Sequence, residues 1–149
     1  MNFDINHLYL TVEGRIGRQS FWIGIIGLVV VSVVINVIIG ALFGWLSFGT
    51  RLIQFIVQLA LAYPAYCLMA KRFQDRAKPA TFAAAIVGIN ILYSVVALIG
   101  LTGMPGVPNA FGIVFGMVMA VIGIWILIEL GILRGTAGDN AYGPDPLQG

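Results

Sequence analysis

The side chains of this chain that could do chemistry are mostly charged, and they gather in three short segments. The sequence has 8 Lys and Arg, 6 Asp and Glu, and 1 His. The segments lie around residues 15–22, around residues 71–79 and after residue 133. They supply a candidate interaction layer that we expect to form on one face: Arg15, Arg18, Trp22, Arg72, Asp75, Arg76, Asn140, Tyr142 and Asp145. Guanidinium groups match the geometry of phosphate and carboxylate, so this layer is suited to binding rather than to bond cleavage.

Each segment also has a purely structural interpretation. Arg15 and Arg18 are three residues apart and share a helical face, and Trp22 is typical of a membrane interface. These residues either anchor and orient the chain, or clamp a lipid headgroup or an acidic partner. Residues 71–79 are predicted to form a polar loop, in which Asp75 pairs with Arg72 or with an arginine of the first segment.

The tail is predicted to fold back onto the other two segments. Gly135 is suited to cap a helix in the left-handed conformation, and Tyr142 could serve as an aromatic anchor. We expect Asp139 or Asp145 to reach the basic residues Arg15, Arg18, Arg72 or Arg76.

No constellation typical of an enzyme is present in the sequence. It has no Ser/His/Asp set, no Cys/His metal spacing, no phosphate-binding Gly-Lys loop and no paired carboxylates inside the apolar runs. We therefore predict no catalytic, cofactor-binding or metal-ligating residues, no cofactor and no enzyme activity. His7 is interpreted as part of a solvated face, and Cys67 as a packing residue.

The polar residues inside the apolar runs are few, and four of them are candidate sites: Gln54, Gln58, Asn90 and Glu129. Hydrogen bonds between helices are the expected role of the amides. Glu129 is expected to pair with Arg134, Lys71 or Arg72; the alternative is a carboxylate coupled to proton or ion movement.

The elements that must position these residues are membrane spans. The chain is 60% hydrophobic and 9% charged, its mean hydropathy is +0.99, and residues 19–50, 52–70 and 79–128 carry no charge. About 20 apolar residues in a helix cross a bilayer. We predict one integral membrane domain, residues 1–149, with spans at about 21–46, 52–70, 81–101 and 111–133 and a tail at 134–149. The fold class is an all-α membrane protein, a four-transmembrane-helix bundle.

Local patterns refine this bundle. Pro64 should kink the second span, and the small residues Gly40, Gly44, Gly112 and Gly116 could allow close packing of helices within the bundle or between copies. Apolar residues at helical spacing before Gly14 predict a short N-terminal interfacial helix, with an irregular segment as the alternative.

The distribution of Lys and Arg predicts the orientation. Four spans place both termini and the connection after the second span on one side, which holds seven of the eight basic residues. Positive charges favour the cytoplasm, so the termini and the C-terminal tail are predicted to be cytoplasmic. The six acids lie near the same face, which leaves its net charge near +1 and argues against nucleic-acid binding.

Three motifs in this order resemble a known family. They are Gly14-Arg15-x-x-Arg18-x-x-Phe21-Trp22, Lys71-Arg72-Phe73-Gln74-Asp75, and Gly135-Thr136-x-Gly138-x-Asn140-x-Tyr142-Gly143-Pro144-Asp145-Pro146. Together they are similar to the domain-of-unknown-function 805 family, which implies a small multi-pass protein of the bacterial inner membrane and no assigned activity. Gln74 stands where that family often has His, so a proton-relay or metal role is not expected there.

The most consistent functional hypothesis is a non-enzymatic accessory or scaffold protein whose cytoplasmic polar layer binds a partner or lipid headgroups. The expected partners are membrane lipids, another membrane or cytoplasmic protein, or further copies of the chain. An oligomeric transporter or channel component is the alternative, and a lipid-acting enzyme lacks an evident nucleophile.

Overall fold

A computed structural model describes residues 5–104 and 106–147 of the chain. In chain order the elements are α1 (Ile5–Tyr9), α2 (Arg18–Phe43), α3 (Phe48–Asp75), α4 (Thr81–Leu98), β1 (Gly103–Met104), β2 (Val107–Pro108), α5 (Ala110–Ile126) and the π-helix η1 (Leu127–Ile132). Among the described residues, four helical segments are long and apolar enough to cross a membrane, with mean hydropathies from 1.7 to 2.9. The predicted number of spans is confirmed, and the chain is a multi-pass membrane protein.

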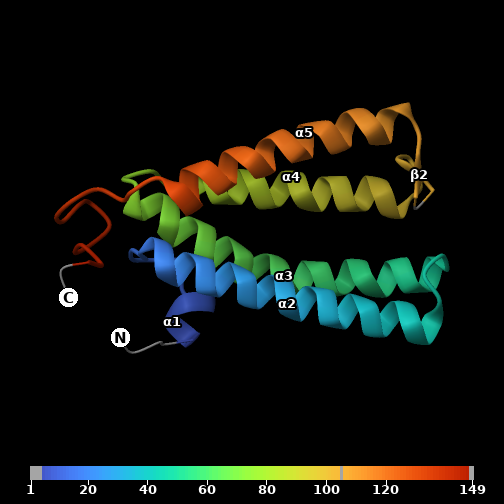
Figure 1. Cartoon of the computed structure of the whole chain (residues 1–149), viewed down its shortest axis with the longest axis horizontal. Helices are drawn as coiled ribbons and strands as arrows, with labels where there is room; N and C mark the ends of the chain where they lie inside the picture. Colours follow the sequence, from blue (N-terminus) through green and yellow to red (C-terminus); the bar gives the residue numbers. More distant parts are fainter. Residues whose placement is uncertain (1–4, 105, 148–149) are drawn as a thin grey trace.

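The helices form two antiparallel pairs with α3 at the centre. Figure 1 shows α2 beside α3 and α4 beside α5, and α3 contacts both α2 and α4. α1 and residues 133–147 lie at one end of the molecule, which we call the tail end. The connections α2–α3 and α4–α5 lie at the opposite end, which we call the hairpin end because β1 and β2 pair there as antiparallel strands.

Side chains cap the two helices that begin at the hairpin end. Ser47 Oγ accepts the N–H of Thr50 (3.0 Å) before α3, and Asn109 Oδ1 accepts the N–H of Gly112 (2.8 Å) before α5. These caps satisfy N–H groups that the helices leave unpaired at their first turns. The predicted spans at 81–101 and 111–133 leave a connection between α4 and α5, but its strand pairing was not predicted.

Helix α3 is longer than expected, and the predicted polar loop at residues 71–79 is wrong over its first half. The helix continues through Asp75, and Lys71, Arg72 and Asp75 are buried. Charged residues can stay in this last turn because other segments of the chain supply their hydrogen-bond partners. Pro64 lies inside α3, and Figure 1 shows the helix changing direction in its second half, as expected of a proline kink.

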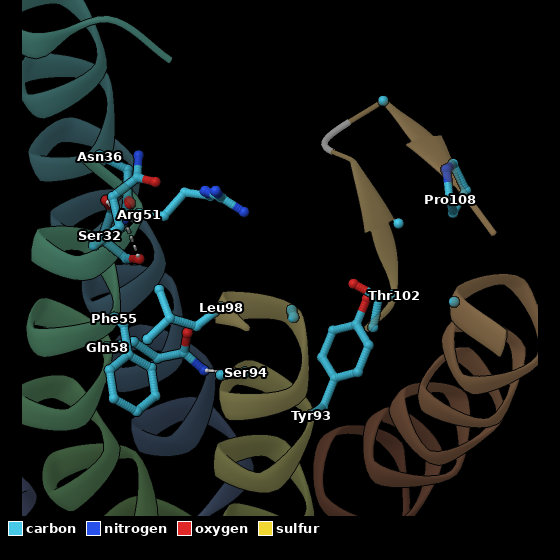
Figure 2. A pocket seen from close by; sticks show the side chains of 15 residues that line it. Ser32, Asn36, Arg51, Phe55, Gln58, Tyr93, Ser94, Leu98, Thr102 and Pro108 are labelled. Carbon is cyan, nitrogen blue, oxygen red and sulfur yellow. Dashed lines mark hydrogen bonds between the residues drawn. The ribbon is translucent and has the colours of Figure 1, made fainter. Parts of the chain in front are cut away.

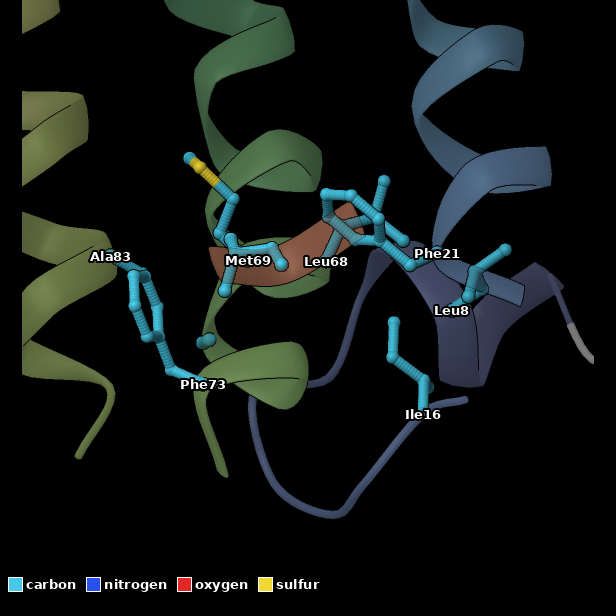
Figure 3. Close-up of a cluster of buried hydrophobic side chains, with 9 residues drawn as sticks. Leu8, Ile16, Phe21, Leu68, Met69, Phe73 and Ala83 are labelled. Carbon is cyan, nitrogen blue, oxygen red and sulfur yellow. The ribbon is translucent and has the colours of Figure 1, made fainter. Parts of the chain in front are cut away.

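The buried hydrophobic residues gather at the tail end rather than along the spans. Figure 3 shows Leu8, Phe21, Leu68 and Phe73 in this cluster, which joins α1, α2 and α3. Apolar side chains in the middle of the spans face outward instead; Val121, for example, is 67% exposed. A surface this apolar is suited to contact with lipid.

The small-residue motifs do not bring helices together within one copy. A Cβ added at Gly116 would meet no other atom within 4 Å. One added at Gly40 would lie 2.6 Å from the ring of Trp45, and one at Gly112 would lie 2.2 Å from the carbonyl oxygen of Thr102. Gly40 and Gly112 therefore leave room for the connecting segments at the hairpin end. The predicted close packing between helices of one copy is wrong.

Candidate functional site

Asp75, the last residue of α3, lies at the centre of the polar residues at the tail end. Its Oδ1 accepts a hydrogen bond from Arg15 Nε (3.1 Å), and its Oδ2 accepts one from Arg72 Nη1. All three side chains are at least 95% buried. The two pairings that the sequence offered as alternatives therefore occur together.

Arg15 connects this centre to the tail. Its Nη1 donates to the carbonyl oxygens of Gly138 (2.7 Å) and Gly143 (3.1 Å), and its Nη2 donates to that of Thr136 (2.6 Å). The tail can present these carbonyls to one guanidinium because Gly138 and Gly143 have φ of 73° and 133°, values that favour glycine.

Arg72 connects the same centre to the end of the fourth span. Its Nε donates to the carbonyl of Leu130 (2.7 Å) and its Nη2 to that of Leu133 (2.6 Å). Carbonyls at a helix C-terminus have no partner within the helix, and a buried cation needs acceptors, so each group satisfies the other.

The tail also caps the C-terminus of α3. The backbone N–H of Thr136 and its hydroxyl both donate to the carbonyl of Asp75 (2.8 and 3.0 Å). The side-chain amide of Asn140 donates to the carbonyl of Gln74 (3.0 Å) and to Thr136 Oγ1 (2.8 Å). The prediction that the tail folds back onto both polar segments is confirmed, although Thr136 was missed as a contact residue.

Gly135 has a different role from the one predicted. It does not adopt a positive φ, and the capping position after η1 belongs to Leu133. A Cβ at Gly135 would lie 2.0 Å from Asp75 Oδ2. The tail therefore needs glycine here because its backbone passes against the central carboxylate.

Glu129 is paired, but its predicted partners are wrong. Its Oε1 accepts from Arg76 Nε (2.8 Å) and from Lys78 Nζ (2.6 Å). Lys71 and Arg72 are not available to Glu129 because they point to α1 and to the carbonyls of residues 130 and 133.

The burial of Lys71 was not predicted from the sequence. Lys71 is fully buried, and its ammonium donates to the carbonyls of His7 and Leu8, the latter at 2.9 Å. A cation at these carbonyls stabilises the C-terminal end of α1, which ends at Tyr9 rather than near Gly14. Leu8, an apolar residue at helical spacing, is the part of α1 that packs into the core.

Arg18 and Trp22 hold the end of the fourth span against α2. Trp22 Nε1 donates to the carbonyl of Gly131 (3.2 Å), and Arg18 Nη1 donates to that of Ile132 (3.1 Å). Arg18 is exposed, whereas Arg15 is buried, so the two arginines have different surroundings despite their spacing.

The tail carboxylates bind backbone groups rather than arginines. Asp145 accepts from the N–H of Leu147 (3.0 Å) and from that of Gly138 (2.9 Å), and these bonds hold the pKa of its carboxyl below the usual value. Within residues 5–104 and 106–147, neither Asp139 nor Asp145 forms an ion pair with an arginine, so that prediction is wrong. Tyr142 contributes its backbone N–H, which donates to Asn140 Oδ1 (2.8 Å).

A cavity of about 700 Å³ opens beside these residues at the tail end. Among the described residues, its charged lining consists of four arginines and two carboxylates: Arg15, Arg18, Arg72, Arg134, Asp75 and Asp145. This lining has an excess of positive charge. We call this space the arginine cavity.

The polar residues inside the spans lie away from the arginine cavity. Gln58 Nε2 donates to Asn90 Oδ1 (2.7 Å) and to Ser94 Oγ (2.6 Å), which confirms the predicted hydrogen bonds between helices, here α3 and α4. Gln54 lines a second cavity toward the hairpin end. In the part of the chain that the structure describes, no group of three or more His, Cys, Asp or Glu side chains is placed to hold a metal.

Comparison with known proteins supports the resemblance noted in the sequence. A family model described as a protein of unknown function (DUF805) matches residues 9–144. No curated protein and no solved structure matches the chain. The matched range includes Arg15, Asp75 and the tail residues that bind them, and the chain therefore belongs to the DUF805 family of proteins of unknown function.

Proposed function

We propose that this protein is a non-enzymatic accessory or scaffold protein of the bacterial inner membrane, and that its arginine cavity binds the phosphate of an anionic lipid headgroup. The observation that carries the proposal is the charge of the cavity, which is lined by four arginines and two carboxylates among the residues that the structure describes. Guanidinium groups bind phosphate with matched, bidentate geometry.

The arginines of the cavity divide into two functional groups. Arg15 and Arg72 are buried and hold Asp75 and the backbone of the tail, so they form a rigid, positively charged floor. Arg18 and Arg134 are exposed. These two are the side chains that can turn toward a headgroup without breaking the buried contacts.

The orientation of the spans is part of this proposal. Seven of the eight basic residues belong to the tail end and Arg51 alone to the hairpin end, so the positive-inside rule places the tail end, with both termini, in the cytoplasm. In that orientation α1 lies along the inner leaflet, where the exposed side chains of Ile5 and Leu10 can enter lipid.

The distribution of cavities favours an accessory role over transport. A transport path through one copy would join the polar residues in the middle of the bundle to Glu129. The two cavities described share no lining residue, and neither is lined by Glu129, whose carboxylate is held by Arg76 and Lys78.

Limited proteolysis at the tail end tests headgroup binding. The purified protein is placed in nanodiscs of phosphatidylcholine alone or with phosphatidylglycerol, and tryptic cleavage after Arg134 is followed by mass spectrometry. We expect the anionic lipid to slow this cleavage several-fold, because a bound headgroup would cover the exposed Arg134. Arg18→Gln should remove most of that protection.

Arg51→Gln is the matched control, since it removes one arginine at the opposite end and should leave the protection unchanged. Equal cleavage of the wild-type protein in both membranes would overturn headgroup binding at this cavity. Protection that appears only with a bound protein would assign the cavity to a protein partner instead.

A further inference from the structure

A second cavity, of about 540 Å³, lies between the two helix pairs toward the hairpin end. Its walls come from α2, α3, α4, the β1–β2 hairpin and the first turn of α5. The polar side chains lining it include Asn36, Arg51, Gln54, Tyr93 and Ser94, and Figure 2 shows several of them around the same space. We call this space the hairpin cavity.

Arg51 is the one charged residue among those that line the hairpin cavity. It is also the only charged residue between positions 19 and 70. Figure 2 shows its guanidinium extending from α3 into the space that faces the hairpin. Within residues 5–104 and 106–147, no carboxylate lines this cavity, in contrast to the arginine cavity.

The contacts of Arg51 leave its charge uncompensated. Its Nε is buried and has no hydrogen-bond partner among the described residues. Its guanidinium carbon lies 5.8 Å from the centre of the Phe48 ring, a cation–π contact that does not neutralise the charge. A cation among apolar helices is costly unless a counter-ion or hydrogen-bond acceptor meets it.

We propose that the hairpin cavity binds one anionic phospholipid, with the lipid phosphate on Arg51. The single positive charge and the absence of lining carboxylates match one phosphodiester. Asn36, Gln54 and Tyr93 can add hydrogen bonds to the headgroup. This site lies at the opposite end of the spans from the arginine cavity, so it does not depend on the function proposed above.

The remaining walls favour a lipid over a soluble anion. Phe55, Ala97 and Leu98 line the same cavity and provide an apolar surface next to the polar side chains. An acyl chain can occupy this surface while the phosphate stays at Arg51. A free phosphate would leave the apolar part of the cavity without a partner.

Native mass spectrometry of the full chain in neutral detergent tests the proposal. Phosphatidylglycerol, phosphatidylcholine and inorganic phosphate are titrated separately, and bound molecules are counted. We expect phosphatidylglycerol to bind to the wild-type protein. Arg51→Gln should lower the affinity for one of the bound lipid molecules by about tenfold or more, since loss of a charge-assisted hydrogen bond changes affinity by that order. Arg51→Lys keeps the charge but loses the planar donor group, and should weaken binding less.

A second pair of variants tests the cavity without removing the charge. Ala97→Phe fills the cavity and should also remove one bound lipid. Ala85→Phe adds the same bulk at an exposed position of α4 outside the cavity, and should leave binding unchanged.

Three outcomes would overturn the proposal. One is unchanged binding of phosphatidylglycerol by both Arg51→Gln and Ala97→Phe. The second is binding of phosphatidylcholine as tightly as phosphatidylglycerol, which would make the cavity a general acyl-chain site. The third is binding of inorganic phosphate as tightly as phosphatidylglycerol. Loss of lipid in Arg18→Gln but not in Arg51→Gln would uphold the arginine cavity alone, so the two proposals can fail separately.

Discussion

Among single residues, the Asp75 carboxylate is shared by two buried guanidinium groups, those of Arg15 and Arg72. Asp75→Asn removes the negative charge at nearly constant volume. The two buried guanidinium groups then keep their carbonyl partners but lose their shared carboxylate. Breaking a buried ion pair in this way costs about 3 to 5 kcal/mol. We expect a loss of that order in the free energy of unfolding, measured by unfolding in mixed detergent micelles.

Glu13→Gln is the matched control for this prediction, because it also removes one carboxylate, from an exposed position. Its effect on stability should be within about 0.5 kcal/mol, as for most surface substitutions. Equal stability of the two variants would mean that Asp75 is not the centre of the tail end.

Asp145 makes the folding of the tail sensitive to acid. Hydrogen bonds from the backbone of Leu147 and Gly138 lower the pKa of its carboxyl when the tail is folded. A group whose pKa is lowered by folding stabilises the folded form above its ordinary pKa, and that contribution disappears as the pH falls through the lowered value.

We therefore expect the Asp145 contribution to be intact at neutral pH, to decline once the pH falls below the ordinary aspartate pKa of 3.8, and to be lost only below the lowered pKa of the folded tail. Hydrogen exchange of the Gly138 amide, followed as a function of pH and corrected for its intrinsic rate, measures this loss. In Asp145→Ala, protection of that amide should be low at every pH. Protection that stays constant in the wild-type chain as the pH falls well below 3.8 would contradict the prediction.

Among the elements, the tail and the end of α3 approach each other most closely at Gly135. A methyl group there would lie 2.0 Å from Asp75 Oδ2, so Gly135→Ala must displace either the tail or the carboxylate. We expect a stability loss of about 1 to 3 kcal/mol, the usual cost of overpacking, together with faster tryptic cleavage after Arg134.

Gly116→Ala is the control, because its added methyl group would meet no other atom within 4 Å and it lies within α5. That substitution should be neutral or slightly stabilising, as glycine is a poor helix former. If Gly135→Ala were equally neutral, the tail would be able to move away from α3 without cost.

The elements also show what the sequence could predict. Long apolar runs without charge are a direct physical requirement of membrane spans, so four spans could be predicted from the order of residues along the chain. The position at which α3 ends could not be predicted in this way. In the sequence alone, Lys71 and Arg72 have the pattern of charged residues at a membrane interface, and only their partners show that they are buried. Apart from Asp75, those partners include the carbonyls of residues 7, 8, 130 and 133, and a backbone acceptor leaves no signature in the sequence.

The candidate site shows the same limit. The pairing of Asp75 with Arg72 and Arg15 was predictable, because opposite charges in a small polar region attract each other. The partners of Glu129 depended on which way each basic side chain points from α3, and hydropathy does not report direction. The uncompensated charge of Arg51 became evident only when the hairpin cavity showed which residues surround it.

For the whole molecule, the two ends of the bundle should lie on opposite sides of the membrane. Topology reporters fused at Arg51 and at Asn109 should both give a periplasmic signal, and one fused after Arg134 a cytoplasmic signal, because basic residues are retained in the cytoplasm. An alkaline phosphatase and a fluorescent protein at each position provide opposite readouts. A cytoplasmic signal at either hairpin-end position would contradict the four-span topology.

The contact between Arg15 and the carbonyl of Gly138 joins residues 123 positions apart, and this separation sets an order in time. At roughly 5 to 20 residues per second, Gly138 is synthesised about 6 to 25 s after Arg15. During that interval α2 and α3 can enter the bilayer, while the Arg15 guanidinium must remain in contact with water or lipid headgroups. The arrival of the tail therefore takes this arginine out of water only after α2 and α3 have been synthesised.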